Sequence, residues 1–392
     1  MNKQKIMFIA HYDSPENYEQ QRSVALSACN KMDFVINTLR NLGYDVEVIS
    51  LATTYGMEDA SAKQYYTKDG IGVRLFYAIG RKRGIIRVLN RITIRLQALI
   101  CLLRNIKKDE IIFAYHAMSL IPVITVVKWL AGCKLILEME EIYGDVSGKQ
   151  EWRKRELNFA KLADAYIFPT QLLNDVINKQ NKPAVIAHGT YQTEAERGCD
   201  VFQERGWDFD PAKIHCVYAG TLDPRKGAAA AVAAAEFLPE NYHIHILGFG
   251  NEKEKRDIRD LVEKYAKSCK CGISYDGLLS GEDYIRFIQS CDIGLSTQDP
   301  TAAFNATSFP SKVLSYMANG LRVVSIRIEA IERSAVNDLI TYYDMQTPEE
   351  IAKAIMRVNM DEDYDSRERI AELDNVFTQE LHKILGELNN GS

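Results

Sequence analysis

The first half of the chain alternates short apolar runs with longer segments of helical periodicity. Apolar runs predict strands at residues 6–10, 45–50, 111–115, 134–138, 165–169 and 184–187, and periodic apolar positions predict helices at 30–42, 120–130 and 151–162. Strands that alternate with helices pair in parallel, and the helices cover both faces of the sheet. The first half therefore predicts a doubly wound α/β domain.

The same alternation starts again in the second half. Strands are predicted at 215–219, 243–247, 273–276, 293–296 and 322–326, and helices at 227–237, 252–268, 283–291, 349–358 and from about 365 onward. Residues 189–213 are polar and lack periodicity, which indicates a linker in which 192–197 could form a short helix. We expect two Rossmann-like, parallel-sheet domains, 1–188 and 214–367, that face a cleft, with the helix at 368–392 able to pack back on the first domain.

One predicted helix start, in the segment 307–324, suits an anion. Ser308 is placed to cap free backbone N–H groups, Pro310 suits the first helical position, and Gly320 can take the positive φ that ends a helix. Unpaired N–H groups and the helix dipole attract negative charge there. Lys312 in the first turn opposes that dipole, which makes sense if its ammonium reaches a bound phosphate. The alternative is an ordinary capped helix with a solvated lysine.

Three loops that follow predicted strands of the second half suit a nucleotide diphosphate. In the first, Arg225 and Lys226 precede a helix start, so that cation and dipole can act on one anion, or they form a solvated charge pair. The second, Gly248-Phe-Gly250, lets backbone approach a ligand, although so short a pattern is weak evidence. In the third, backbone groups after Asp276 could hydrogen-bond a base edge while Leu278 or Leu279 covers its face, or the loop is a simple turn.

Composition excludes several classes of protein. The chain has 392 residues and a net charge of −5, which gives no reason to expect nucleic-acid binding. Of eight scattered cysteines only Cys269 and Cys271 lie close, and no second Cys/His pair nearby completes a zinc site, so we expect reduced thiols in a cytoplasmic protein. The N-terminus lacks the apolar core of a signal peptide, and the longest apolar run, 111–127, is too interrupted for a membrane span.

The chain resembles the GT-B glycosyltransferases, and within them the retaining family 4 type, most closely from about 217 to 324. In that family a Gly-Arg-x-x-x-x-Lys-Gly loop grips the diphosphate of a sugar nucleotide. The matching run extends from Gly220 to Gly227, with Lys226 in the lysine position and Thr221 in the arginine position. Arg225 could supply the missing charge from its neighbouring position.

The family also carries a Glu-x7-Glu pair, and these positions fall on Thr307 and Ser315 here. The Ser308-Phe-Pro310 turn still matches, and Ser311-Lys312 resembles a variant found in sugar transferases of bacterial surface-polysaccharide assembly. The resemblance implies donor contacts from Gly220, Thr221, Arg225, Lys226, Gly248, Gly250, Asp276, Leu278, Ser308, Phe309, Ser311, Lys312 and Ser315.

This resemblance implies retaining transfer of a sugar from a nucleotide sugar to a glycan or lipid-linked acceptor. The departing diphosphate would help to deprotonate the acceptor, and helix N-termini, Lys226 and Lys312 would stabilise its charge. No Asp-x-Asp motif that could hold Mg²⁺ follows a predicted strand. The motif Asp361-Glu-Asp363 lies instead in a polar connection, where we expect it to be solvated. We therefore expect neither a metal nor a cofactor beyond the nucleotide-sugar co-substrate.

The first half has carboxylates where the family often has a histidine beside the reacting sugar. Glu138, Glu140 and Glu141 lie together at the end of a predicted strand. Glu140 or Glu141 could bind a hydroxyl, stabilise an oxocarbenium-like centre or take the acceptor proton, or they mark a charged helix start. His116 and His11 also follow predicted strands. Each could line the cleft, or each could be a structural histidine. Our catalytic candidates are Glu140, Glu141 and His116.

Residues 74–108 contain ten Lys and Arg residues and no Asp or Glu. Arg87, Arg91 and Arg95 recur at helical spacing, with leucines and isoleucines between them. Such a basic amphipathic helix can lie on an anionic bilayer, which would place the protein on the inner face of the membrane near a lipid-linked acceptor. The alternative is a core-facing apolar stripe with solvated arginines.

Two other functions stay open. A sugar-nucleotide 2-epimerase needs carboxylates and histidines around one sugar, and the second half supplies few. A glycosyltransferase-like subunit that has lost catalysis and binds a partner or glycan is favoured by the missing glutamate pair. Donor hydrolysis separates both from an active transferase.

Overall fold

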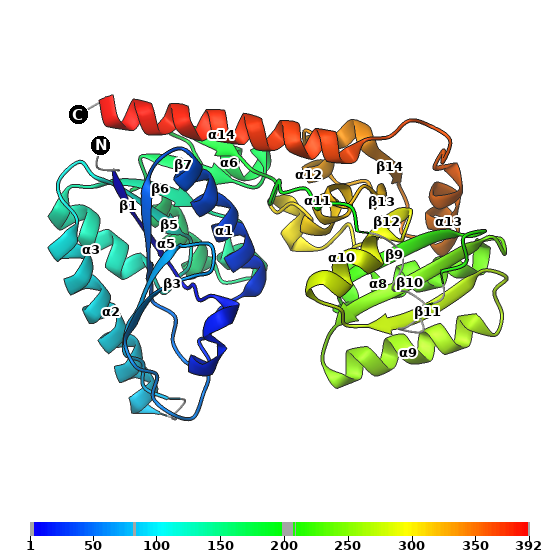
Figure 1. Ribbon diagram of the computed structural model, residues 1–392, viewed down its shortest axis with the longest axis horizontal. Coiled ribbons are helices and arrows are strands. Elements are labelled where there is room, and N and C mark those ends of the chain that lie inside the picture. Colours follow the sequence, from blue (N-terminus) through cyan, green and yellow to red (C-terminus); the bar gives the residue numbers. More distant parts are fainter. Residues whose placement is uncertain (1–3, 81–83, 198–206, 208, 391–392) are drawn as a thin grey trace. The chain divides into compact units, whose positions relative to one another are not determined.

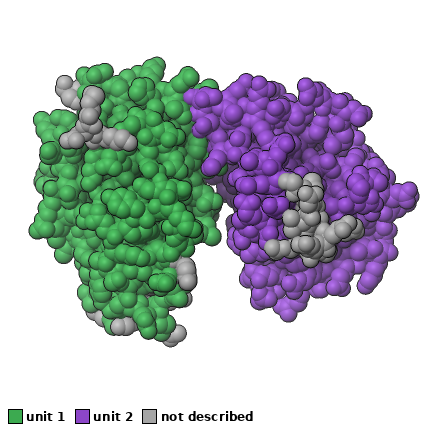
Figure 2. Space-filling view, in the orientation of Figure 1, with its two compact units in different colours: residues 1–190, 376–392 green, residues 191–375 purple. Residues whose placement is uncertain are grey.

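The computed structural model describes residues 4–80, 84–197, 207 and 209–390 (Figure 1). The chain divides into two compact units, Met1–Thr190 with Val376–Ser392, and Tyr191–Asn375 (Figure 2). Helix α14 (Ser366–Asn390) contributes to both units. Among the described helices, none is both long enough and apolar enough to cross a membrane.

Unit 1 is built on an eight-stranded sheet with the order β3-β4-β2-β1-β5-β6-β7-β8. Its strands are β1 (Lys5–Ala10), β2 (Asp45–Ser50), β3 (Lys63–Tyr66), β4 (Gly72–Leu75), β5 (Ile111–Tyr115), β6 (Lys134–Glu138), β7 (Ala165–Phe168) and β8 (Ala184–Ile186). Its helices are α1 (Leu26–Asn41), α2 (Ile85–Asn105), α3 (Ile121–Ala131), α4 (Tyr143–Val146), α5 (Gln150–Ala160) and α6 (Gln171–Ile177).

The central strands β1, β5 and β6 are buried on both faces, which explains their continuous apolar runs. The sheet is not fully parallel, because the edge strand β3 pairs antiparallel with β4. Neither strand is predicted from the sequence, since residues 63–66 form an edge strand whose side chains are mostly exposed and give no apolar run.

Unit 2 is built on a six-stranded, fully parallel sheet with the order β11-β10-β9-β12-β13-β14. Its strands are β9 (Ile214–Thr221), β10 (Tyr242–Phe249), β11 (Gly272–Gly277), β12 (Ile293–Ser296), β13 (Arg322–Ile326) and β14 (Ile340–Tyr343). Its helices are α8 (Ala228–Ala234), α9 (Glu252–Ala266), α10 (Gly281–Gln289), α11 (Ser311–Ala318), α12 (Glu329–Glu332) and α13 (Pro348–Arg357).

The strand order reverses once in each sheet, between β1 and β5 in unit 1 and between β9 and β12 in unit 2. In doubly wound sheets ligands bind outside the carboxyl ends of the strands at such a reversal. The predicted architecture of two Rossmann-like α/β units is therefore confirmed, and it directs attention to two strand-end regions.

The predicted short helix at 192–197 is wrong. These residues form no helix, because their backbone donors bond to other parts of unit 2: the N–H of Glu194 donates to the carbonyl of Ala318 at 3.0 Å, and the N–H of Arg197 to the side chain of Gln289 at 2.8 Å. Most of the remaining predicted linker, 198–206 and 208, lies outside the described residues.

Candidate functional site

The loop that follows β9 is held at the sheet reversal of unit 2. The hydroxyl of Tyr218 lies within hydrogen-bond distance of the carbonyls of Thr221 (2.8 Å) and Lys226 (3.0 Å). Asp223 caps the short 3-10 helix Pro224–Lys226 and pairs with the guanidinium of Arg225 at 2.7 Å. This hydrogen bond lowers the pKa of Asp223 to about 2. Arg225 therefore already has a counter-charge, and Lys226 is the better candidate for an anion contact.

Gly227 fixes how this loop ends. Its φ is +91°, and an added Cβ would lie 1.8 Å from the carbonyl oxygen of Thr297. The hydroxyl of Thr297, at the end of β12, donates to the carbonyl of Gly227 at 2.7 Å. Only glycine fits this position, so the loop is docked on the neighbouring strand at the reversal point.

Two lysines from different elements meet at this loop. Lys312, in the first turn of α11, donates to the carbonyl of Lys226 at 3.3 Å, and its ammonium lies 3.8 Å from the ring centroid of Tyr218. The ammonium of Lys226 lies 3.6 Å from the ring centroid of Phe304. Burial, and then the charge of Lys226, lower the pKa of Lys312 to about 7. Among the described residues no carboxylate pairs with Lys312, so the site favours a bound anion.

The predicted cap of α11 is wrong. The helix begins at Ser311, one residue later than expected, and Pro310 occupies the cap position with φ −74° and ψ 99°. Ser308 then lies two residues before the cap position, and its N–H donates to the carbonyl of Phe304 at 2.9 Å. Pro310 itself has no side chain that can cap this start. The predicted C-terminus is confirmed, because Gly320 has a φ of +87°.

Packing accounts for the two glycines after β10. An added Cβ at Gly248 would lie 2.2 Å from the carbonyl oxygen of Gly220, so the two strand ends approach closely. An added Cβ at Gly250 would lie 2.5 Å from the carboxylate of Glu254, which forms a capping box with Asn251 at the start of α9. These glycines shape the strand ends whether or not a ligand is bound.

The remaining donor candidates are spread more widely. Leu278 is 66% exposed after β11, Phe309 is buried, and Ser311 is exposed at the start of α11. The hydroxyl of Ser315 lies 3.2 Å from that of Tyr284. The structure thus gathers Gly220, Thr221, Lys226 and Lys312 at one strand end and leaves the others around it.

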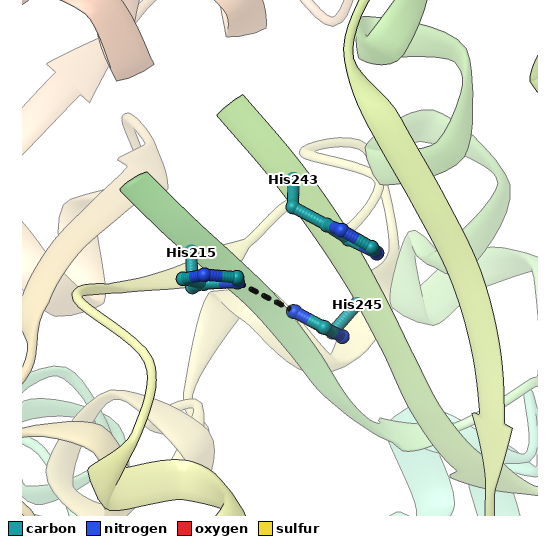
Figure 3. Close-up of side chains that lie close together, drawn as sticks. All are labelled: His215, His243 and His245. Atoms are coloured by element: carbon teal, nitrogen blue, oxygen red, sulfur yellow. Dashed lines mark hydrogen bonds between the residues drawn. The ribbon is translucent and has the colours of Figure 1, made fainter. Parts of the chain in front are cut away.

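Unit 2 also contains a cluster of three histidines that was not predicted from the sequence (Figure 3). The Asp276 carboxylate lies 3.3 Å from Nδ1 of His245, one of its members. His215 from β9 and His245 from β10 lie 2.9 Å apart, nitrogen to nitrogen, and the rings of His243 and His245 stack at 4.1 Å. Burial lowers the pKa of His243 to about 3. The His243-x-His245 spacing on a predicted strand was the available signal, since it places both side chains on one face.

In unit 1, Glu138 ends β6 as a fully buried carboxyl. Neither of its oxygens has a hydrogen-bond partner among the described residues. Burial first, and then the charge of Glu140, raise the pKa of Glu138 to about 8. Burial also raises the pKa of Glu140. Lys31 offsets both increases, although its ammonium is already bound to the carbonyls of Ala187 and Gly189 at 2.8 and 2.7 Å.

His116 occupies a structural position in the strand-end region of unit 1. Its Nε2 lies 2.8 Å from Glu156, a fully buried carboxylate that also accepts the N–H groups of Tyr143 (2.9 Å) and Gly144 (2.7 Å). This network holds α4 against α5. These contacts favour a structural role for His116, and its catalytic role stays a prediction. Glu140 and Glu141 are half-buried.

Helix α2 carries two apolar stripes. The first is buried and consists of Ile94, Ala98 and Leu102, as the core-facing alternative expects. The second is exposed and consists of Ile86, Val88, Leu89, Ile92, Leu96 and Ile100. Arg91 and Arg104 are exposed on the same helix, whereas Arg95 donates to the carbonyl of Ser119 at 3.1 Å. The Arg87 side chain lies outside what the structure describes.

Comparison with protein families gives one match, in which residues 213–361 fit the family described as "Glycosyl transferases group 1". This segment covers most of unit 2. No curated protein sequence matches the chain.

Solved structures resemble the whole chain at low sequence identity. Sucrose-phosphate synthase from Thermosynechococcus elongatus has a TM-score of 0.70 at 14% identity, with 100% of both chains covered. HepE of Anabaena, solved in complex with UDP, has a TM-score of 0.64 at 13% identity, covering 99% of this chain and 100% of that one. An Escherichia coli trehalose-6-phosphate structure bound with UDP-2-fluoro glucose has a TM-score of 0.58 at 12% identity, covering 96% of each chain. These likenesses establish the GT-B fold.

Proposed function

We propose that this protein is a glycosyltransferase that moves a sugar, with retention, from a nucleoside diphosphate sugar to a glycan or lipid-linked acceptor. One observation carries the proposal. The ammonium of the half-buried Lys312 has no counter-charge among the described residues and lies beside Lys226, at the sheet reversal of a segment that matches group 1 glycosyltransferases. A diphosphate supplies the charge that this place lacks.

The two lysines are the groups that this chain offers to the leaving diphosphate. Its negative charge increases as the bond to the sugar breaks, and fixed cations stabilise that charge in the transition state. The N–H groups at the start of α11, where the cap residue Pro310 makes no side-chain hydrogen bond, lie in the same turn as Lys312 and would add to this effect. We propose that these groups suffice without a metal ion, and that the diphosphate oxygen takes the acceptor proton.

A thermal-shift panel tests the donor site. UDP is the first nucleotide to try, because related structures hold UDP, and GDP, ADP, CMP and dTDP follow with their sugars. Binding to the folded state raises the melting temperature by mass action. We expect one base class to give a shift that Lys312→Met reduces and that the exposed control Lys253→Met retains. A panel without any shift would contradict the proposal.

The replacement of the Glu-x7-Glu pair by Thr307 and Ser315 favours a second candidate, a subunit that binds without catalysis. Release of nucleoside diphosphate from the donor that scores in the panel separates the two. An active transferase hydrolyses its donor slowly, and Lys226→Ala abolishes this release. Binding without any release identifies the inactive subunit, and interconversion of sugar nucleotides identifies an epimerase.

For the acceptor side we propose Glu140 and Glu141, which follow β6 beside the buried Glu138. Their carboxylates can bind acceptor hydroxyls or stabilise a developing positive centre. If so, Glu140→Gln and Glu141→Gln lower transfer to an acceptor while leaving the nucleotide-induced thermal shift unchanged. Equal losses of both measurements would instead indicate a general folding defect.

For the acceptor's location we propose an anionic membrane surface that binds α2. Exposed apolar side chains on one stripe, with Arg91 and Arg104 on the same helix, are the composition of an interfacial helix. Flotation with vesicles of phosphatidylcholine, with and without phosphatidylglycerol, tests this. We expect binding only with the anionic lipid, and its loss in Leu96→Ser and in Arg91→Gln but not in the control Lys253→Gln. Equal flotation with both lipids, or none, would count against it.

A further inference from the structure

Three of the chain's seven histidines lie together inside unit 2 (Figure 3). His243 and His245 alternate along β10, so the pleat places both on one face of the sheet. His215 pairs in register with His243 from the adjacent strand β9. All three side chains are more than nine-tenths buried, and one ring nitrogen of each lies within 4.8 Å of the others.

Oxygen atoms orient one ring nitrogen of each histidine. Nε2 of His215 lies 2.9 Å from the carbonyl of Asp210, and Nε2 of His243 lies 3.1 Å from the hydroxyl of Ser274. Nδ1 of His245 lies 3.1 Å from that hydroxyl and 3.3 Å from the carboxylate of Asp276. Histidines that bind metals usually donate their second ring N–H to such a carbonyl or carboxylate, which fixes the tautomer.

One of the remaining ring nitrogens has no hydrogen-bond partner among the described residues. Nδ1 of His215 and Nε2 of His245 lie 2.9 Å apart. Nδ1 of His243 is buried without a hydrogen-bond partner in that part of the chain. A buried polar atom without a partner is unfavourable, so this nitrogen calls for a cation or a rearrangement.

We propose that His215, His243 and His245 form a transition-metal site, and that Zn²⁺ suits it best. Zn²⁺ takes imidazole nitrogen in tetrahedral sites and is bound by three histidines in known proteins. A water would supply the fourth ligand, because the Asp276 carboxylate lies on the Nδ1 side of His245, away from its Nε2. The site is distinct from the lysine pair at the strand ends, and it does not depend on the proposed sugar transfer.

Ion binding requires a definite rearrangement. Zn–N bonds of about 2.0–2.1 Å place ligand nitrogens roughly 3.3 Å apart in a tetrahedron, so the cluster must contract on its widest side. The rings of His243 and His245 are stacked with only 4° between their planes. Because a ring nitrogen's lone pair lies in the ring plane, one of these rings must turn out of the stack. Rotation about χ2 of histidine is soft, which makes that turn feasible.

The site has a structural consequence. The ion would cross-link β9 and β10 and, through the contact of His245 with Asp276, the edge strand β11. These three strands lead into the loops at Gly220, Gly248 and Leu278. Metal binding would therefore hold the donor side of the sheet together without taking part in bond making or breaking.

The experiment uses the full chain without a polyhistidine tag, stripped with a chelator and then titrated with Zn²⁺ against a chromophoric competitor. We expect one equivalent of Zn²⁺ per chain, and a Co²⁺ derivative with the intense visible absorption of a tetrahedral site. His245→Gln should lower Zn²⁺ affinity at least 100-fold. The control His188→Gln removes another buried histidine, one bound to the carbonyl of Pro169 at 2.7 Å, and should leave Zn²⁺ affinity unchanged.

Two results would overturn the proposal: no stoichiometric Zn²⁺ in the unmodified chain, or the same affinity in His245→Gln as in that chain. The first needs no variant, so it holds even if His245→Gln fails to fold. Asp276→Asn gives a further measurement, because loss of a carboxylate that orients a ligand lowers metal affinity about 10–100-fold. An octahedral Co²⁺ spectrum that is identical in this variant would also count against the site.

Discussion

Replacement of Lys312 by methionine should stabilise the protein and weaken donor binding. Methionine keeps the length and apolar stem of lysine and removes the ammonium. The pKa of Lys312 is lowered from 10.5 to about 7, chiefly by burial and then by Lys226. The folded protein therefore disfavours the ammonium, whereas the unfolded chain keeps its proton up to pH 10.5.

This difference sets the sign and size of the effect. Below pH 7 the ammonium is present in both states, and its folded-state penalty is complete, at most about 4–5 kcal/mol. The penalty declines as pH rises from 7 and vanishes at about pH 10.5, where both states are neutral. Denaturant unfolding of Lys312→Met should thus show a gain of up to about 4 kcal/mol at pH 6.5 and about 1 kcal/mol at pH 9.5.

Nucleotide binding, unlike folding, should favour the ammonium form of Lys312. A charge-assisted hydrogen bond contributes about 1.5–3 kcal/mol, so Lys312→Met should weaken nucleoside diphosphate binding roughly 10–150-fold. A bound diphosphate also favours the ammonium, so the unmodified protein should take up close to one proton on binding at pH 8 and almost none at pH 6. Calorimetry in buffers with different ionisation enthalpies measures this uptake.

The control is Lys253→Met, which removes an exposed lysine of α9 and should change neither measurement. The reasoning would be refuted if Lys312→Met lost stability at pH 6.5. It would also be refuted if the unmodified protein bound its nucleotide at pH 8 without taking up a proton.

Three further predictions concern stability. The pKa of Glu138 is raised from 4.5 to about 8 by burial and then by Glu140, so the free energy of unfolding falls as pH rises through this range. In denaturant unfolding, Glu138→Gln should leave that free energy unchanged at pH 4.5 and increase it by up to about 4 kcal/mol at pH 8. Gly227→Ala should lose more than about 3 kcal/mol, because its Cβ meets a carbonyl at 1.8 Å, whereas Gly386→Ala has open space and should not destabilise. Glu156→Ala should lower the free energy of unfolding by about 3–5 kcal/mol, because two backbone N–H groups and a histidine lose their partner. A loss under about 1 kcal/mol would mean that water takes the place of the carboxylate.

The sequence predicted the fold well wherever burial alone determines an element. The strands at 45–50, 111–115, 134–138, 293–296 and 322–326 have the bounds that the apolar runs predict, because each is covered on both faces. The hairpin at 63–75 was missed, since an exposed edge needs no apolar run. The position of Ser308 was misjudged by local rules: Pro310 can begin a helix or precede one, and here it takes an extended conformation at the cap.

The candidate site was only partly predictable, because its chemistry depends on distant residues. Lys226 and Lys312 are far apart in sequence, and only the parallel order of β9, β12 and β13 brings their loops together. The same holds for His215 and His245. The burial of Glu138 could not be predicted for another reason. It ends an apolar run, and the neighbouring residues in the sequence do not indicate that both of its oxygens are buried without hydrogen-bond partners among the described residues.

Each unit has, at a strand end, an ionisable group without a partner of opposite charge among the described residues: Lys312 in unit 2 and Glu138 in unit 1. Stability alone does not explain either group. A fold selected for stability alone would pair Lys312 with a carboxylate or replace it, and would do the same with Glu138, since each unpaired buried ionisable group is unfavourable. Other ionisable groups do have partners: Glu156 pairs with His116 in unit 1, and Arg225 pairs with Asp223 in unit 2. The architecture can therefore supply partners where they are needed. Local rules are broken mainly at functional sites. An ammonium at the reversal of one sheet and a carboxyl at the end of β6 in the other are therefore the groups that the proposed function completes, with an anion in unit 2 and a hydroxyl-bearing acceptor in unit 1.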